Sequence, residues 1–165
     1  MKLFSKLILL ALLGVGGYFG YLWLFPSEES QIRKRMEELS ATVSLDAQAG
    51  NIRRGLMMES FPRFFTSKCQ IKVSYKGSTR TMSGRPDMAN AARYLAGLPG
   101  GIKVEFHDLT VTVDPEKKIA KGALTMTMMQ LDTQTLSAQQ FQIELAKEDG
   151  KWLVAKAETI ESLSR

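Results

Sequence analysis

The sequence contains a single cysteine and a single histidine among its 165 residues, which excludes several common kinds of site. Cys69 has no second cysteine with which to form a disulfide, and no cluster of His, Cys and carboxylates stands at metal-ligand spacing. No glycine-rich phosphate loop is present, so nucleotide binding has no support. The sequence therefore predicts no metal and no cofactor. Cys69 stands close to Ile71 and Val73, which favours a core position on a strand over a reactive thiol.

Concentrated charge of one sign is also missing. The formal net charge is +5, of which Lys2 and Lys6 supply two. Lysines and arginines are scattered, whereas a nucleic-acid-binding protein gathers them on one face with aromatic residues between them. We therefore expect no nucleic acid partner.

One long hydrophobic run is present, at residues 7–25, and it contains no charge. At about 1.5 Å per residue, a helix of this length spans roughly 28 Å, close to the thickness of a bilayer core. The run ends in aromatic residues, including Trp23 and Phe25, and in Pro26, whereas a secretory signal has a shorter run and a small-residue cleavage pattern. We therefore interpret residues 1–26 as an uncleaved transmembrane signal anchor. A cleaved signal peptide and a buried core helix are the alternatives.

The orientation of this anchor follows only weakly from charge. Lys2 and Lys6 precede the run, and residues 33–35 supply three basic residues after it. Because a short basic tail directly before an apolar run usually stays in the cytoplasm, we expect residues 27–165 on the outer side. The predicted location is a single-pass protein of the inner (cytoplasmic) membrane with a periplasmic C-terminal domain.

Residues 27–165 suffice for one compact domain. Their first half predicts three helices. The first spans residues 27–44, with Glu28 and Glu29 in its first turn and an apolar stripe at spacings of three and four. The second spans residues 52–65 and ends or kinks at Pro62. After a short hairpin that starts near residue 68, the third spans residues 85–97, with Pro86 in its first turn. The stripe of the first helix consists of Ile32, Met36, Leu39 and Val43.

The second half predicts four long strands, at residues 102–113, 119–131, 136–147 and 152–160. In the first of them the apolar residues change parity, from even positions up to Phe106 to odd positions from Leu109 onward. Alternation of period two changes parity only when an extra residue is inserted. We therefore expect a β-bulge at His107–Asp108 that bends the sheet strongly.

This order of elements resembles the nuclear transport factor 2-like superfamily, also called the SnoaL-like or cystatin-like α+β cone, over about residues 30–162. The stretches that carry the resemblance are "FPRFFTSKCQIKV", "GRPDMANAARYL" and "EDGKWLVAKAETI". The resemblance implies an α+β fold with a curved antiparallel sheet, of about four long strands plus a short hairpin, wrapped around three helices. Its members include isomerases, dehydratases and cyclases as well as non-enzymatic binding and assembly domains, so the fold does not decide the activity.

His107 is the one candidate for a catalytic base, because an imidazole can exchange a proton near neutral pH and bulges often re-aim side chains at sites. The resemblance implies that an enzyme of this superfamily would place Asp, His and Tyr on the inner walls of the cone. No such set can be matched here, so a structural or exposed histidine is the favoured interpretation.

Two other groups of residues are candidates for binding. Met126 and Met128 form a flexible, polarizable wall that either fills an irregular core or accepts varied apolar ligands. Phe141, Tyr94 on the third helix and Phe65 at the mouth would complete such a pocket.

The opposite face of the same strands is polar, uncharged and rich in residues that favour strands. It is either an interface with a second copy or a protein partner, or a merely soluble surface. Its members are Thr125, Thr127, Gln140 and Gln142.

Three hypotheses about function follow. The first is a membrane-anchored, non-enzymatic interaction or assembly module that self-associates, as a homodimer, or binds a protein partner through its sheet. The second is a carrier or sensor of a small apolar molecule in a methionine-lined cavity. The third is an isomerase- or dehydratase-type enzyme that uses His107. A cavity of roughly 300 Å³ or more distinguishes the second from the first, and a solvent-facing His107 excludes the third.

Overall fold

The computed structural model describes residues 26–75 and 78–160. The expected membrane anchor, apart from Pro26, lies outside these residues. Within the described ranges, no helix combines the length and the apolar composition that crossing a bilayer requires.

The first helix, α2 (Glu28–Val43), follows the expected pattern closely. Ser27 caps it, since the Ser27 side chain accepts a hydrogen bond from the backbone N–H of Ser30 at 3.2 Å. Two glutamates occupy its first turn, where the positive end of the helix dipole favours them. The four residues of the predicted stripe are all buried, so this prediction is confirmed.

The second helix breaks at Pro62, as the sequence predicts. Helix α3 (Asn51–Ser60) passes into a 3-10 turn, η1 (Phe61–Phe64), which contains Pro62. Two apolar residues of α3, Ile52 and Leu56, are 83% and 53% exposed. The reason is that α3 packs against α4 and η1 rather than on the sheet, so that only Met57 of its apolar residues is buried.

Helix α4 (Gly84–Ala96) begins at a sharp corner of the backbone. Gly84 has a φ of +73°, a conformation that glycine adopts without steric cost. The Asp87 carboxylate accepts a hydrogen bond from the backbone N–H of Ser83 at 2.8 Å, which satisfies one free donor at the helix start. Met88 and Ala92 of this helix are buried in the core.

Six strands form one sheet in the order β2-β1-β6-β5-β4-β3. Neighbouring strands run antiparallel except β1 and β6, which are parallel. The expected antiparallel sheet is therefore mixed, because this one pair is parallel. Turns join β3 to β4, β4 to β5 and β5 to β6, whereas β1 and β6 are far apart in the chain and no turn fixes their direction. The strands are β1 (Phe65–Tyr75), β2 (Ser78–Ser83), β3 (Ile102–Asp114), β4 (Ile119–Gln130), β5 (Thr135–Glu148) and β6 (Lys151–Thr159).

The predicted bulge in β3 is confirmed. His107 pairs with Thr125, but the next pair is Thr110 with Ala123, and Asp108 has a φ of +53°. The inward-facing position moves from Phe106 to Leu109 at this point, as the change of parity requires.

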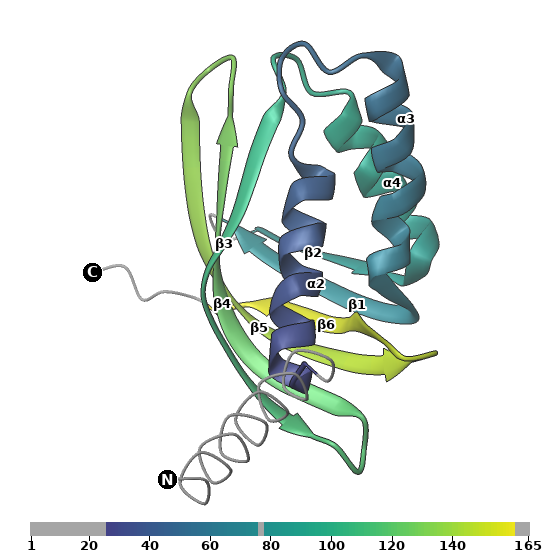
Figure 1. The fold of residues 1–165 in the computed structure, drawn as a ribbon. Coiled ribbons are helices and arrows are strands. Elements are labelled where there is room, and N and C mark those ends of the chain that lie inside the picture. Colours follow the sequence, from purple (N-terminus) through teal and green to yellow (C-terminus); the bar gives the residue numbers. More distant parts are fainter. Residues whose placement is uncertain (1–25, 76–77, 161–165) are drawn as a thin grey trace, which may run out of the picture.

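The sheet bends at the bulge and encloses the helices. Figure 1 shows the long strands β3, β4 and β5 curving around α2, with α3 and α4 beside it. Opposite the bulged strand stands Gly122, where a Cβ atom would overlap the carbonyl oxygen of Thr110, so only glycine permits this close approach of β3 and β4. In the described part of the chain the fold is α+β, a curved six-stranded sheet wrapped around three α-helices, as expected for a cone.

Candidate functional site

A cavity of about 780 Å³ lies between the concave face of the sheet and helices α2 and α4. All six strands contribute to its wall, and α3 does not. The volume falls within the range of about 300–1,000 Å³ that ligand pockets occupy. Its inner wall is apolar and consists mainly of Met36, Leu39, Val43, Phe61, Phe65, Ile71, Met88, Val104, Phe106, Leu124, Met126, Met128, Phe141, Ile143 and Val154.

The five pocket residues expected from the sequence all line this one cavity. Met126 and Met128 lie on β4, and Phe141 pairs with Leu124 across the β4–β5 ladder. Tyr94 is 72% exposed and stands at the edge of the cavity. Phe65 is buried in the wall rather than at the mouth, because the chain has already entered β1 at this residue.

Sequence reasoning missed a second part of the wall, which α2 provides. Met36, Leu39 and Val43 were expected only as core residues, and they also border the cavity. Helical periodicity indicates which face of α2 points inward. It carries no information on whether the space in front of that face is filled.

The mouth of the cavity lies between β2 and α4. Every exposed residue of the lining belongs to one of these two elements. Polar groups gather there, and they were not expected as site residues; the exposed ones are Ser78, Arg80, Thr81, Asn90 and Tyr94.

The chemistry available in the cavity is limited by where its titratable groups stand. Arg80, Asp87 and Tyr94 are the titratable residues of the described lining, and all three belong to β2 or α4. The Asp87 carboxylate already accepts the N–H of Ser83. The opposite wall, from β3 to β5, is built of Val, Leu, Ile, Met and Phe, and therefore offers no acid or base to a molecule inside.

His107 lies outside the cavity. Its side chain is exposed on the convex face of the sheet, and Nε2 is 3.1 Å from Oγ1 of Thr127. The neighbouring Asp108 is exposed in the bulge, and among the described contacts it makes no hydrogen bond to the imidazole. The bulge thus turns His107 toward solvent, and the hypothesis of a base acting on a bound molecule loses its one candidate.

A model of the SnoaL-like domain family matches residues 45–158, which is more than half of the chain. The chain belongs to the SnoaL-like family. The match begins after α2 and ends within β6, so it covers most of the cavity wall. A comparison of the sequence with curated proteins gave no match.

Solved structures share the fold of this SnoaL-like domain at low identity. A candidate scytalone dehydratase from Novosphingobium aromaticivorans DSM 12444 is 14% identical, with a TM-score of 0.64 over 84% of this chain and 89% of its own. An NTF2-like protein with a cystatin-like fold from Novosphingobium aromaticivorans is 13% identical, with a TM-score of 0.60 over 91% and 90%. The β subunit of a candidate aromatic-ring-hydroxylating dioxygenase from Novosphingobium aromaticivorans DSM 12444 is 11% identical, with a TM-score of 0.59 over 82% and 90%. At these identities the likeness shows the fold alone.

The convex face of the SnoaL-like domain brings together the four residues expected at an interface. Thr125 pairs with Gln140 across β4 and β5, and Thr127 and Gln142 stand two residues farther along their strands on the same face. Leu136, also on this face, is 66% exposed. We call the group formed by these five residues the convex band.

Charged side chains flank the convex band as ion pairs. Lys103 and Glu105 lie 2.9 Å apart on β3, and Lys121 and Glu144 lie 3.5 Å apart across β4 and β5. The side chains of both pairs are exposed, so each pair contributes little to stability. The centre of the band remains uncharged.

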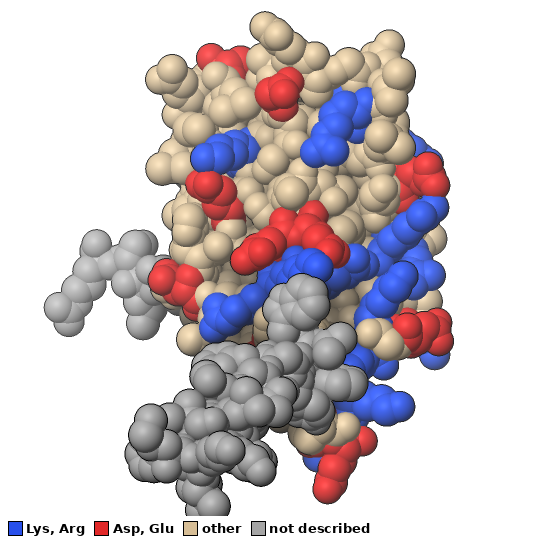
Figure 2. Space-filling view, in the orientation of Figure 1, with Lys and Arg blue, Asp and Glu red and all other residues tan. Residues whose placement is uncertain are grey.

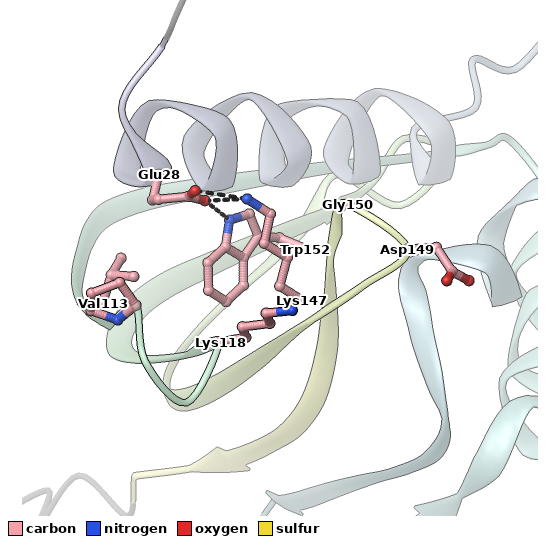
Figure 3. A pocket seen from close by; sticks show the side chains of 8 residues that line it. Glu28, Val113, Lys118, Lys147, Asp149, Gly150 and Trp152 are labelled. Carbon is pink, nitrogen blue, oxygen red and sulfur yellow. Dashed lines mark hydrogen bonds and ion pairs between the residues drawn. The ribbon is translucent and has the colours of Figure 1, made fainter.

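A smaller hollow of about 470 Å³ stands at the start of α2. The Glu28 carboxylate accepts hydrogen bonds from Nζ of Lys147 at 2.7 and 2.8 Å and from Nε1 of Trp152 at 2.8 Å. Figure 3 shows these three side chains facing one another, while Asp149 points away. The hydrogen bond from Lys147 lowers the pKa of Glu28, and burial offsets part of that effect. We call Glu28, Lys147 and Trp152 the Glu28 cluster. It ties the first turn of α2 to the β5–β6 hairpin, and its negative and positive charges pair with each other.

A third hollow, of about 550 Å³, contains several arginines. The Arg35 guanidinium donates to Glu38 and to the carbonyl of Arg63, both at 3.1 Å, and it lies 3.9 Å from the centre of the Phe64 ring. Arg53 donates to the carbonyl of Ala41. Figure 2 shows acidic side chains beside the basic ones on the face that carries α2. The arginines of this hollow therefore bond to backbone carbonyls and glutamates of the same chain.

Proposed function

We propose that this SnoaL-like domain binds a small apolar molecule in its cavity without transforming it. The observation that carries the proposal is the empty space of about 780 Å³ behind an apolar wall. Met and Phe side chains that line a space open to water gain free energy when an apolar molecule covers them, and the volume falls within the range of ligand pockets. Its titratable groups stand on β2 and α4 at the mouth, which favours a carrier or sensor over an enzyme.

The wall suits ligands of variable shape. Methionine is unbranched and polarizable, and Met36, Met88, Met126 and Met128 surround the space together with phenylalanines. Burying apolar surface contributes about 25 cal/mol per Å², so a ligand of moderate size gains enough to bind. Specificity would then come from size and from the polar groups at the mouth.

Native mass spectrometry of the full-length protein tests the proposal. The protein is held in an amphipathic polymer, so that no free detergent competes, and is incubated with 1-dodecanol as a neutral apolar probe. We expect one dodecanol per chain on the wild type. Met126→Trp places an indole in the cavity and should remove the adduct. Thr127→Trp, on the next residue but the opposite face of β4, is the matched control and should keep it.

Two results would contradict the proposal. The first is a wild-type protein that carries no dodecanol at concentrations that saturate other apolar pockets. The second is an adduct that survives in Met126→Trp as well as in Thr127→Trp, because the probe would then sit elsewhere.

Self-association through the convex band is a second candidate, supported by its uncharged centre and the exposed Leu136. A two-fold interface repeats the same surface on both copies, so Thr127→Cys should bring two new thiols together. Cys69 is buried and is the sole native cysteine, so the new thiol has no accessible competitor. Mild oxidation of the full-length variant should give a disulfide-linked dimer. A protein that stays monomeric, in mass and on oxidation, would exclude this interface.

We further propose that residues 7–25 hold the domain at the outer side of the inner membrane. The uncharged run is long enough to span a bilayer, and α2, whose first turn the Glu28 cluster fixes, begins directly after it. Protease added to spheroplasts should digest the domain, and alkaline carbonate should leave it with the membranes. A protein released by carbonate, or protected until the cells are lysed, would contradict this location.

A further inference from the structure

Among the described residues that line the cavity, Arg80 is the one that carries a positive charge. It pairs with Val73 of β1, and the next inward residues, Met82 and Ile71, also form a pair and line the cavity. Side chains alternate between faces with period two, so Arg80 extends from the same face as these apolar residues. An arginine at such a position lays its aliphatic stem along the wall and leaves its guanidinium at the polar edge, which here is the mouth.

The Arg80 guanidinium has no partner in the described part of the chain: no hydrogen bond or ion pair there involves it. The exposed arginines of the third hollow, by contrast, are engaged with glutamates or backbone carbonyls. Among the described residues of the lining, Asp87 is the one acidic residue; one of its oxygens accepts the N–H of Ser83 at the start of α4, and it forms no ion pair with Arg80. The cation at the mouth is therefore available to a ligand.

The neighbouring polar groups at the mouth add donors. The Asn90 Oδ1 atom accepts a hydrogen bond from Nη1 of Arg93 at 2.7 Å, which leaves the Asn90 NH₂ group as a donor. Tyr94 is exposed at the same edge and carries a hydroxyl that can donate. A guanidinium with an amide and a hydroxyl donor is a set that binds an anion, and a planar carboxylate matches the guanidinium in a bidentate manner.

We propose that the cavity selects molecules that carry one carboxylate on an apolar body, with the carboxylate held by Arg80 at the mouth between β2 and α4. The inference rests on the proposed binding function and names the class of ligand. One guanidinium balances one negative charge, and the apolar wall opposite the mouth accepts the rest of the molecule.

The test compares two probes of equal chain length, dodecanoate and 1-dodecanol, on the full-length protein in an amphipathic polymer. It is run at pH 8, far above the ordinary pKa of a carboxyl group. Titrations followed by native mass spectrometry give the dissociation constant of each probe. The variants are Arg80→Met, which keeps an apolar stem, and Lys72→Met, which removes the same charge from the neighbouring strand on the opposite face.

We expect Arg80→Met to raise the dissociation constant of dodecanoate by about tenfold or more. The dissociation constant of dodecanol should stay within about twofold of the wild-type value. Lys72→Met should leave both probes within about twofold. The carboxylate inference is overturned if Arg80→Met leaves dodecanoate unchanged, if it weakens both probes equally, or if the wild type binds dodecanol but not dodecanoate. Failure of the wild type to bind either probe would instead remove the binding function itself.

Discussion

The two faces of the curved sheet are made by the same strands and yet differ in almost every physical respect. On β5, Phe141 is buried against the cavity, and the next residue, Gln142, is exposed on the convex face. On β4, Met126 and Thr127 divide in the same way. The concave face is apolar and borders empty space, whereas the convex face is polar and carries ion pairs at its edges. Alternation along a strand sets the side of each residue, but only the bend in the sheet decides that one side encloses a volume.

The largest effect on stability should come from truncating a residue of the concave face, compared with its sequence neighbour on the convex face. Phe141→Ala removes a buried ring and should lower the free energy of unfolding by about 3 kcal/mol. Gln142→Ala, one residue away, should change it by less than about 0.5 kcal/mol. Urea unfolding of the full-length protein, followed by circular dichroism, measures both. Equal costs for the two variants would contradict the assignment of the faces.

A smaller effect is expected at Met126, and its size reports on the cavity. Truncation of a fully packed methionine costs about 2–5 kcal/mol. Met126 is half-buried and already borders open space, so Met126→Ala should cost only about 1–2 kcal/mol. Thr127→Ala, which removes the partner of His107, should cost about 0.5 kcal/mol. If Met126→Ala lowered the free energy of unfolding more than Phe141→Ala does, Met126 would be fully packed in solution and the cavity would be closed there.

The contrast between the faces also shows how far the sequence could predict the fold. The stripe of α2 was predicted residue by residue, because local periodicity depends only on which side of a helix is buried. The bulge at His107–Asp108 was predicted for the same reason, since a change of parity has a single geometric cause. The exposure of Ile52 and Leu56 could not be predicted, because α3 rests on other helices and no local pattern shows how much of a helix its neighbours cover.

The candidate site was predicted in part. Met126, Met128 and Phe141 could be placed on one wall from alternation alone, but nothing in their spacing distinguishes a cavity from a filled core. Arg80 was missed because its position depends on the pairing of β2 with β1. The Glu28 cluster joins residues more than a hundred positions apart, and such contacts follow from tertiary packing alone.

The Glu28 cluster should contrast with the ion pairs of the convex face. Glu28 is 39% exposed, so solvent screens part of its interaction, and Glu28→Gln should cost about 1 kcal/mol at pH 7. Because the pKa of Glu28 is lowered in the folded protein, the stabilisation by its carboxylate is fully present above the ordinary pKa of a carboxyl group and is lost as the pH falls through the lower pKa of the folded state. The difference in unfolding free energy between wild type and Glu28→Gln should therefore shrink between pH 5 and pH 3, a range set by the ordinary carboxyl pKa of about 4.

Glu144→Gln is the matched control for this measurement. It breaks the exposed pair with Lys121 at 3.5 Å and should cost less than about 0.5 kcal/mol. If Glu28→Gln costs no more than Glu144→Gln at pH 7, the Glu28 cluster does not fix the start of α2.

The smallest effect on stability and binding is expected at His107, which lies on the convex face. Its replacement tests whether that face acts independently of the cavity. His107→Gln keeps a group able to bond Thr127 and exposes no new apolar surface, so the free energy of unfolding should change by less than about 0.5 kcal/mol. Dodecanol and dodecanoate should bind the variant within about twofold of the wild type, since the imidazole lies on the other side of the sheet from the cavity. A tenfold loss of binding in His107→Gln would require the bulge to rearrange when the cavity is occupied, which would couple the two faces that the bend of β3 separates.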